Sequence, residues 1–131
     1  MLKAAYFDIT AIMELLKGGK NILPKIEAYR EFYTGANTAA QLVGMEEFLV
    51  EKKVLKAHEL RGLLDSLNVL PFTKEDAEKA GEILGQLKAA GKNVSLEEAR
   101  VVAQCIRRGL TLITNRNLKD FEGLKLKEDR I

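Results

Sequence analysis

Apolar residues along this chain fall into short runs and into helical spacing, and the first run opens the sequence. Residues 2–7 are almost all apolar and end at Asp8, the pattern of a parallel strand that is covered on both faces. Residues 10–17 are again mostly apolar and two glycines follow them, which predicts a short helix with a glycine stop. Residues 21–33 show helical spacing, although residues 31–35 also fit a brief strand, so the pattern leaves this stretch open.

The rest of the chain alternates predicted helices with predicted strands. Residues 38–41, Thr-Ala-Ala-Gln, have the form of a capping box and predict that a helix starts at Thr38. Pro71 indicates that the strand around it lies at a sheet edge or ends there. The alternation indicates one α/β domain over residues 1–131, with a small parallel sheet flanked by helices. The further predicted helices are 57–67, 73–91 and 95–109, and the further strands are 68–72, 110–114 and 124–126.

Composition excludes several classes of protein. With 47% hydrophobic and 31% charged residues and no uncharged apolar run of about 18 residues, the 131-residue chain is neither disordered by composition nor membrane-spanning. The net charge of +2 is too small to indicate nucleic-acid binding by itself. One cysteine and one histidine exclude an internal disulfide and a Cys/His zinc site, so any metal would need oxygen ligands. Asp8 interrupts the first apolar run too early for a signal peptide, and we expect a cytoplasmic protein.

Polar residues follow two of the predicted strands. Asp8 comes directly after the first strand, and Glu98 lies where the helix that leads into strand 110–114 begins. In a parallel sheet, the carboxyl ends of strands and the N-termini of the helices that connect them meet at one edge, where active sites gather. Gln41, in the helix after residues 31–35, reaches the same edge. We therefore expect these side chains to lie close together: Asp8, Gln41, Glu98, Asn115, Asn117 and Asp120.

These oxygen ligands indicate a hard divalent cation. Carboxylates and amides, without sulfur or imidazole, suit Mg²⁺ or Mn²⁺. A metal held in this way can orient a water, lower its pKa and neutralise charge on a phosphate, which is the chemistry of nucleases and phosphatases. Thr10 and Thr114 are either turn and cap hydroxyls or supports of the ligands. Arg116 and Lys119 lie near the proposed site in sequence and are candidates to hold RNA phosphates.

Three segments resemble the PIN domain, and the VapC-type toxins in particular. They are Phe-Asp-Ile-Thr at residues 7–10, Glu-Ala-Arg-Val-Val-Ala at 98–103 and Gly-Leu-Thr-Leu-Ile-Thr-Asn-Arg-Asn-Leu-Lys-Asp-Phe at 109–121. The resemblance spans almost the whole chain, and its last segment is the most specific part. It implies a metal-dependent endoribonuclease with a small parallel sheet, which forms a dimer and which an antitoxin protein holds inactive by covering the site.

The resemblance also assigns individual residues. Asp8 matches the first carboxylate of the family, and Thr10 matches the small polar residue that steadies it. The second acid, a glutamate in the family, falls on Gln41, and the third falls on Glu98. The last acid falls on Asp120. Its neighbouring ligand is either Asn115 or Asn117, because this loop is one residue longer than the common form.

Gln41 decides between two functions. It keeps a ligating oxygen but lacks one negative charge, so the expected metal affinity is lower. Glu46 or Glu47 would take its place if the helix began elsewhere. The alternative to a ribonuclease is therefore a catalytically weakened PIN-like module that binds RNA or an antitoxin. A third interpretation is an unrelated α/β protein in which Asp8 and Glu98 only cap helices.

Overall fold

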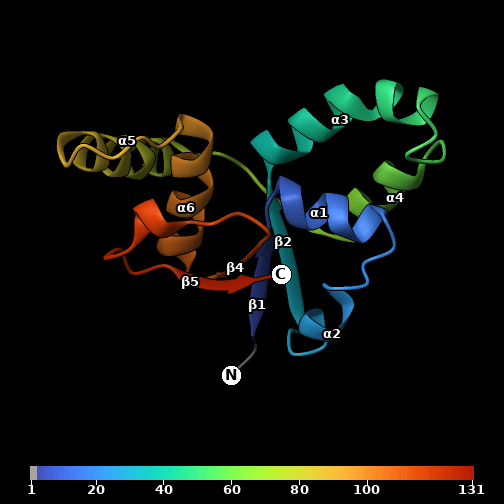
Figure 1. Ribbon diagram of the computed structural model, residues 1–131, viewed down its shortest axis with the longest axis horizontal. Coiled ribbons are helices and arrows are strands. Elements are labelled where there is room, and N and C mark those ends of the chain that lie inside the picture. The colour runs from blue at the N-terminus through green and yellow to red at the C-terminus, as the bar shows by residue number, and fades with distance from the viewer. Residues whose placement is uncertain (1–2) are drawn as a thin grey trace.

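Five strands form the centre of the molecule in the computed structural model, which describes residues 3–131: β1 (Ala4–Phe7), β2 (Glu31–Gly35), β3 (Asn68–Leu70), β4 (Thr111–Thr114) and β5 (Lys127–Arg130). They form one sheet in the order β3-β2-β1-β4-β5, and every neighbouring pair is parallel (Figure 1). The predicted architecture, a small parallel sheet flanked by helices, is confirmed. Residue 2 of the predicted first strand lies outside the described residues.

Helices connect these strands. They are α1 (Ile9–Leu16), α2 (Leu23–Ile26), α3 (Ala36–Glu51), α4 (Glu59–Asp65), α5 (Lys74–Ala89) and α6 (Leu96–Arg108), with a short 3₁₀ helix η1 (Lys119–Phe121) before β5. Within residues 3–131, no helix combines the length and the apolar character that crossing a membrane requires.

Alternate residues of the central strands face opposite sides of the sheet. Tyr6 and Leu112 pack with α5 and α6, whereas Phe7 and Ile113 pack with α1, α3 and α4. Figure 1 shows α5 and α6 on one side of the strands and α1, α3 and α4 on the other. Because β1 and β4 are buried from both sides, their central side chains are apolar, and polar residues follow where the strands end. The polar residues that follow are thereby held at one edge.

Several predicted boundaries need correction. The capping box at residues 38–41 is wrong, because α3 begins at Ala36 with Gly35 as its N-cap and Thr38 is already buried inside the helix. The last strand is 127–130 rather than 124–126. Residues 21–33, which the pattern left open, form α2 and then the first part of β2. Pro71 directly follows β3, an edge strand, as its position in the sequence predicted.

The predicted starts of α5 and α6 are confirmed by their side chains. Thr73 accepts a hydrogen bond from the backbone N–H of Asp76, and the Asp76 carboxylate accepts one from the N–H of Thr73. Ser95 and Glu98 form the same reciprocal pair at α6. The predicted stop of α6 is also present, since Gly109 adopts the left-handed conformation with φ of 64°.

Asp76 additionally joins α5 to α6. Its buried carboxylate accepts hydrogen bonds from Arg108 at 2.7 and 3.1 Å and pairs with Arg107. Burial acts to raise the pKa of Asp76, but the hydrogen bonds from Arg108, the Thr73 backbone, Arg107 and Gln104 outweigh it and hold this pKa well below its usual range. Arg107 and Arg108 stand in the last turn of α6, where cations by themselves suit a solvated helix end or contact with RNA phosphates. The structure instead gives them a role between the helices.

Candidate active site

Asp8 stands at the carboxyl end of β1 and is the N-cap of α1. Its Oδ1 accepts a hydrogen bond from the backbone N–H of Ala11 at 2.9 Å, which accounts for one of the free donors at the start of this helix. The side chain is nevertheless placed at a pocket rather than at open surface, and only 3% of the residue is exposed. The capping interpretation of Asp8 is therefore correct and is compatible with a role in the pocket.

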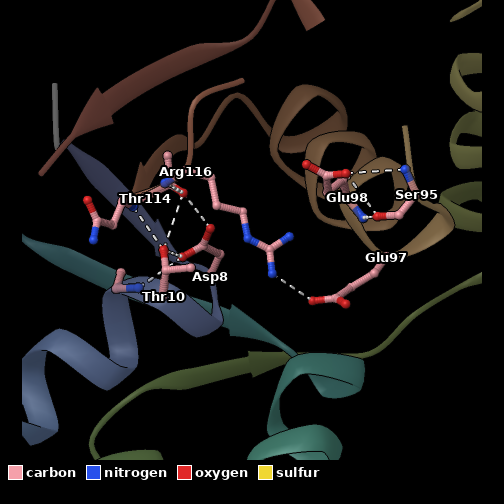
Figure 2. A network of polar contacts seen from close by, with 9 residues as sticks. Asp8, Thr10, Ser95, Glu97, Glu98, Thr114 and Arg116 are labelled. Carbon is pink, nitrogen blue, oxygen red and sulfur yellow. Dashed lines mark hydrogen bonds and ion pairs between the residues drawn. The ribbon is translucent and has the colours of Figure 1, made fainter. Parts of the chain in front are cut away.

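Two threonine hydroxyls hold the Asp8 carboxylate in a fixed orientation. Thr10 donates to Oδ1 at 2.6 Å, and Thr114, at the end of β4, donates to Oδ2 at 2.5 Å. Each threonine in turn accepts a hydrogen bond from the loop after β4: Thr10 from the N–H of Asn115 at 2.8 Å and Thr114 from the N–H of Arg116 at 3.0 Å. The hydroxyls therefore tie the loop to the carboxylate, as Figure 2 shows.

The first turn of α6 brings two more carboxylates to this edge. Glu98 accepts hydrogen bonds at Oε1 from the N–H and the hydroxyl of Ser95, at 3.2 and 3.0 Å. Its neighbour Glu97 accepts one from the Arg116 guanidinium at 3.1 Å. Since Glu98 uses Oε1 for the cap, its second oxygen is the one available to the pocket.

A single pocket is lined by the residue that follows β1, by residues of α6 and β4, and by the loop after β4. Its polar lining is Asp8, Glu97, Glu98 and Arg116, and its apolar lining is Val101, Val102, Leu112 and Leu118. Asp8 and Glu98 thus line the same pocket, as the sequence predicted, although 90 positions separate them in the chain. Figure 2 shows the Arg116 side chain extending from the Asp8 side of the pocket toward α6.

Gln41 lies in an adjoining pocket. The side chains around it are Tyr6, Asn37, Thr38, Phe72, Glu97, Arg100, Val101 and Gln104. Glu97 and Val101 line both pockets, so Gln41 is next to the acidic pocket rather than in it. Glu46 and Glu47 line a different hollow, between α3 and α4, and do not replace Gln41.

The loop after β4 presents its polar side chains mostly to solvent. Asn115, Asn117, Lys119 and Asp120 are all exposed, and none of them lines the acidic pocket. Asn117 instead accepts a hydrogen bond from the N–H of Lys119 at 3.1 Å, a local turn contact. In this structure the loop contributes Arg116 to the pocket and leaves the amides and Asp120 outside it.

The residues present fit a divalent cation by their chemistry. Asp8, Glu97 and Glu98 offer hard carboxylate oxygens, and Glu98 has one oxygen that the cap does not use. In this structure, however, the carboxylates are too far apart to bind one ion together. Residues 3–131 contain no group of three acidic, histidine or cysteine side chains gathered closely enough to hold a metal. Arg116 extends across the pocket toward Glu97, and its guanidinium supplies positive charge there.

Two features of the site were not predicted from the sequence. One is Glu97, for which two successive glutamates at the start of α6 were the available signal. The other lies at the adjoining pocket of Gln41, where Tyr6 donates to Gln104 Oε1 at 2.6 Å and Gln104 Nε2 donates to Asp76 at 3.3 Å. Burial raises the pKa of the Tyr6 phenol, so that it stays a donor. The only sequence signal for this chain of contacts is a glutamine on the apolar face of α6.

The family model of the PIN domain matches residues 6–121. No curated protein matches the sequence. The structure is similar to VapBC2 from Rickettsia felis bound to a DNA fragment from its promoter, with 16% identity over 98% of each chain and a TM-score of 0.78. It is also similar to DNA-bound VapBC from Salmonella typhimurium, with 22% identity over 99% of this chain and 98% of that chain and a TM-score of 0.78.

A more distant neighbour is VapC20 from Mycobacterium tuberculosis, described as a toxin that cleaves the sarcin-ricin loop. It shares 14% identity over 82% of this chain and 86% of its own, with a TM-score of 0.56. Identities this low show a common fold.

Proposed function

Because the chain belongs to the PIN domain family, as its three motif segments indicated, we propose that it is a metal-dependent endoribonuclease of the VapC toxin kind. One observation carries the proposal: Asp8, directly after β1, and Glu98 from α6 line the same pocket at the carboxyl edge of the sheet, together with Glu97. Helix capping accounts for Asp8 and for Glu98 separately, but it does not require the two carboxylates to share a pocket.

The proposed reaction is hydrolysis of an RNA phosphodiester. PIN nucleases generally use a divalent metal, and Mg²⁺ or Mn²⁺ would supply an activated water and neutralise charge on the phosphate. Asp8 and Glu98 would be its carboxylate ligands. Thr10 and Thr114 would keep the Asp8 carboxylate oriented, and Gln41 would act from the adjoining pocket. Asp120 with Asn115 or Asn117 would join only if the loop after β4 moved inward.

Contacts with partners are proposed on separate grounds. Arg116 and Lys119 stand on the loop beside the pocket, where they can pair with RNA phosphates. An antitoxin protein is a proposed partner because neighbours of the same fold are VapBC toxin-antitoxin complexes. Exposed apolar side chains on and just after α3, namely Met45, Phe48 and Val54, offer a surface for a partner protein or for a second copy in a homodimer. The proposed location is the cytoplasm.

The second candidate function is a PIN-like module that binds RNA or an antitoxin without efficient cleavage. Gln41 favours it, because the glutamate of the family is replaced by a neutral side chain in the adjoining pocket. The three carboxylates also do not gather into one metal-binding group.

A comparison of the wild type with Asp8→Asn and Glu98→Gln tests the proposal. Asparagine is as good an N-cap as aspartate, and glutamine also serves in a capping box, so both variants should fold normally. We expect wild-type protein to bind Mn²⁺ and to cleave a structured RNA in Mn²⁺, and both variants to lose these activities. Mn²⁺ binding is followed by calorimetry, and cleavage by gel analysis of end-labelled RNA.

Asp65→Asn is the matched control, because it removes a carboxylate that is exposed at the end of α4. Negligible Mn²⁺ binding in the wild type, or equal binding in the wild type and Asp8→Asn, would contradict the proposed metal site. RNA binding without cleavage, together with Asp8-dependent Mn²⁺ binding, would favour the second candidate function.

A further inference from the structure

Arg116 contributes positive charge to the acidic pocket. Its guanidinium bonds to Glu97 at 3.1 Å, and both residues line the pocket with Asp8 and Glu98. The backbone of Arg116 is fixed, because its backbone N–H donates a hydrogen bond to the same Thr114 hydroxyl that holds Asp8. The guanidinium is therefore tethered to the Asp8 network at one end and paired with α6 at the other (Figure 2).

This arrangement has a simple electrostatic reason. Asp8, Glu97 and Glu98 bring three negative charges to one pocket, and like charges in a partly desolvated site repel. A cation in the pocket relieves that repulsion, and Arg116 supplies one from the chain itself. The pair is also easy to open, because 29% of the Arg116 side chain and 33% of the Glu97 side chain remain exposed.

Glu97 is in addition the carboxylate placed to compensate for Gln41. It lines both the acidic pocket and the pocket of Gln41, so it stands beside the position at which the expected charge is missing. As long as Arg116 holds Glu97, the charge of this carboxylate is largely neutralised. Release of Arg116 would free it.

We infer that Arg116 is an internal counter-cation that competes with a divalent metal for Glu97, and that Glu97 becomes the third carboxylate of the site when Arg116 leaves. The inference rests on the proposed function for the identity of the metal. It explains why the three carboxylates share a pocket and yet do not gather into a metal-binding group. It also gives Arg116 and Glu97 roles that neither family membership nor helix capping requires.

The test is Mn²⁺ affinity, measured by calorimetry and by the electron paramagnetic resonance signal of free Mn²⁺, in Arg116→Met and Arg116→Lys. Methionine keeps much of the length and removes the charge, so Arg116→Met should bind Mn²⁺ about tenfold more tightly than the wild type. Arg116→Lys keeps the charge and should stay near the wild-type affinity. Lys125→Met, which removes an exposed cation away from the pocket, controls for the change in net charge and should alter affinity by less than about twofold.

Glu97→Gln completes the design. It should weaken Mn²⁺ binding. Arg116→Met should then increase Mn²⁺ affinity less in the double variant than it does alone, because the Glu97 carboxylate that the arginine would otherwise neutralise is absent. Circular dichroism establishes that each variant is folded.

Asp8-dependent binding that Arg116→Met leaves unchanged or weakens would overturn the inference while the proposed metal site stands. An equal increase in Mn²⁺ affinity from Arg116→Met in the wild-type and Glu97→Gln backgrounds would overturn the inference as well. Absence of Mn²⁺ binding in both the wild type and Arg116→Met would instead remove the proposed metal site, and the inference with it.

Discussion

Thr114 donates a hydrogen bond to Asp8 Oδ2 at 2.5 Å, although 106 positions separate the two residues in the chain. The contact exists because β1 and β4 are parallel neighbours and end at the same edge of the sheet. The hydroxyl is fully buried and also accepts the N–H of Arg116, so one side chain joins the first strand, the fourth strand and the loop that follows it.

Removal of this hydroxyl should cost stability. Thr114→Val keeps the shape of the side chain but leaves the buried Asp8 oxygen and the Arg116 N–H without a partner, so we expect a loss of about 1–3 kcal/mol in the free energy of unfolding. Urea denaturation measures it. In the Asp8→Ala background, the same substitution should cost less, because the carboxylate is already gone. Equal losses in both backgrounds would show that the two side chains are not coupled.

Restoring a charge at Gln41 should strengthen metal binding under the proposed function. Gln41→Glu adds a carboxylate next to Glu97, and we expect Mn²⁺ affinity to rise about fivefold or more. Ala40→Glu adds the same charge at the neighbouring exposed position on α3, outside the two pockets, and is the control. Calorimetric titration compares the two. An equal or smaller effect of Gln41→Glu would place Gln41 outside the functional site.

The ion pairs of Asp76 should make stability depend on pH. The folded-state pKa of Asp76 is held below its usual range, so its contribution is fully present above the unfolded-state value and is lost as the pH falls through the lower folded-state value. At pH 7 we expect Asp76→Asn to lower the free energy of unfolding by about 2–3 kcal/mol. The difference in the free energy of unfolding between the wild type and Asp76→Asn should narrow progressively as the pH falls from about 5 toward 2.

Urea denaturation at a series of pH values checks this prediction. Asp65→Asn, at an exposed position, should show a gap near zero throughout. A gap for Asp76→Asn that stays constant or widens in acid would contradict the assignment of the ion pairs.

Gly35 is required by close packing rather than by its backbone conformation, since its φ is −95°. A Cβ atom at this position would collide with the Tyr6 hydroxyl and with Gln104 Oε1, which bond to each other. Gly35→Ala should therefore destabilise the protein by about 1–3 kcal/mol. Gly44→Ala is the control, because Gly44 lies inside α3, the helix that Gly35 caps, at a position where a Cβ meets open space. It should stabilise the protein by about 0.5–1 kcal/mol. Thermal unfolding of both variants measures the two changes in stability. Changes of the same sign would contradict the requirement for glycine at position 35.

Local signals in the sequence were sufficient for much of the fold. The capping pairs Thr73 with Asp76 and Ser95 with Glu98 span four residues each, so neither depends on the rest of the molecule, and both helix starts are correctly predicted. The central residues of the buried strands β1 and β4 are apolar on both faces, and both strands end at recognisable polar residues. That the residues following them share one edge could be inferred, because parallel strands bring their carboxyl ends to the same edge of a sheet.

Tertiary packing decided the rest. The start of α3 at Ala36 rather than Thr38 coincides with the close contact of Gly35 with Tyr6 and Gln104, which come from distant segments. Strand β5, Lys-Glu-Asp-Arg, has no apolar pattern because an edge strand is held mainly by its backbone.

The composition of the pocket was likewise not local. By itself, the sequence determined an α/β sheet with Asp8 and Glu98 at one edge. Glu97 and Arg116 line the pocket with them, while Asp120 and the amides face solvent, and this depends on how one loop returns to the sheet. The backbone N–H groups of Asn115 and Arg116 set that path by donating hydrogen bonds to the hydroxyls of Thr10 and Thr114.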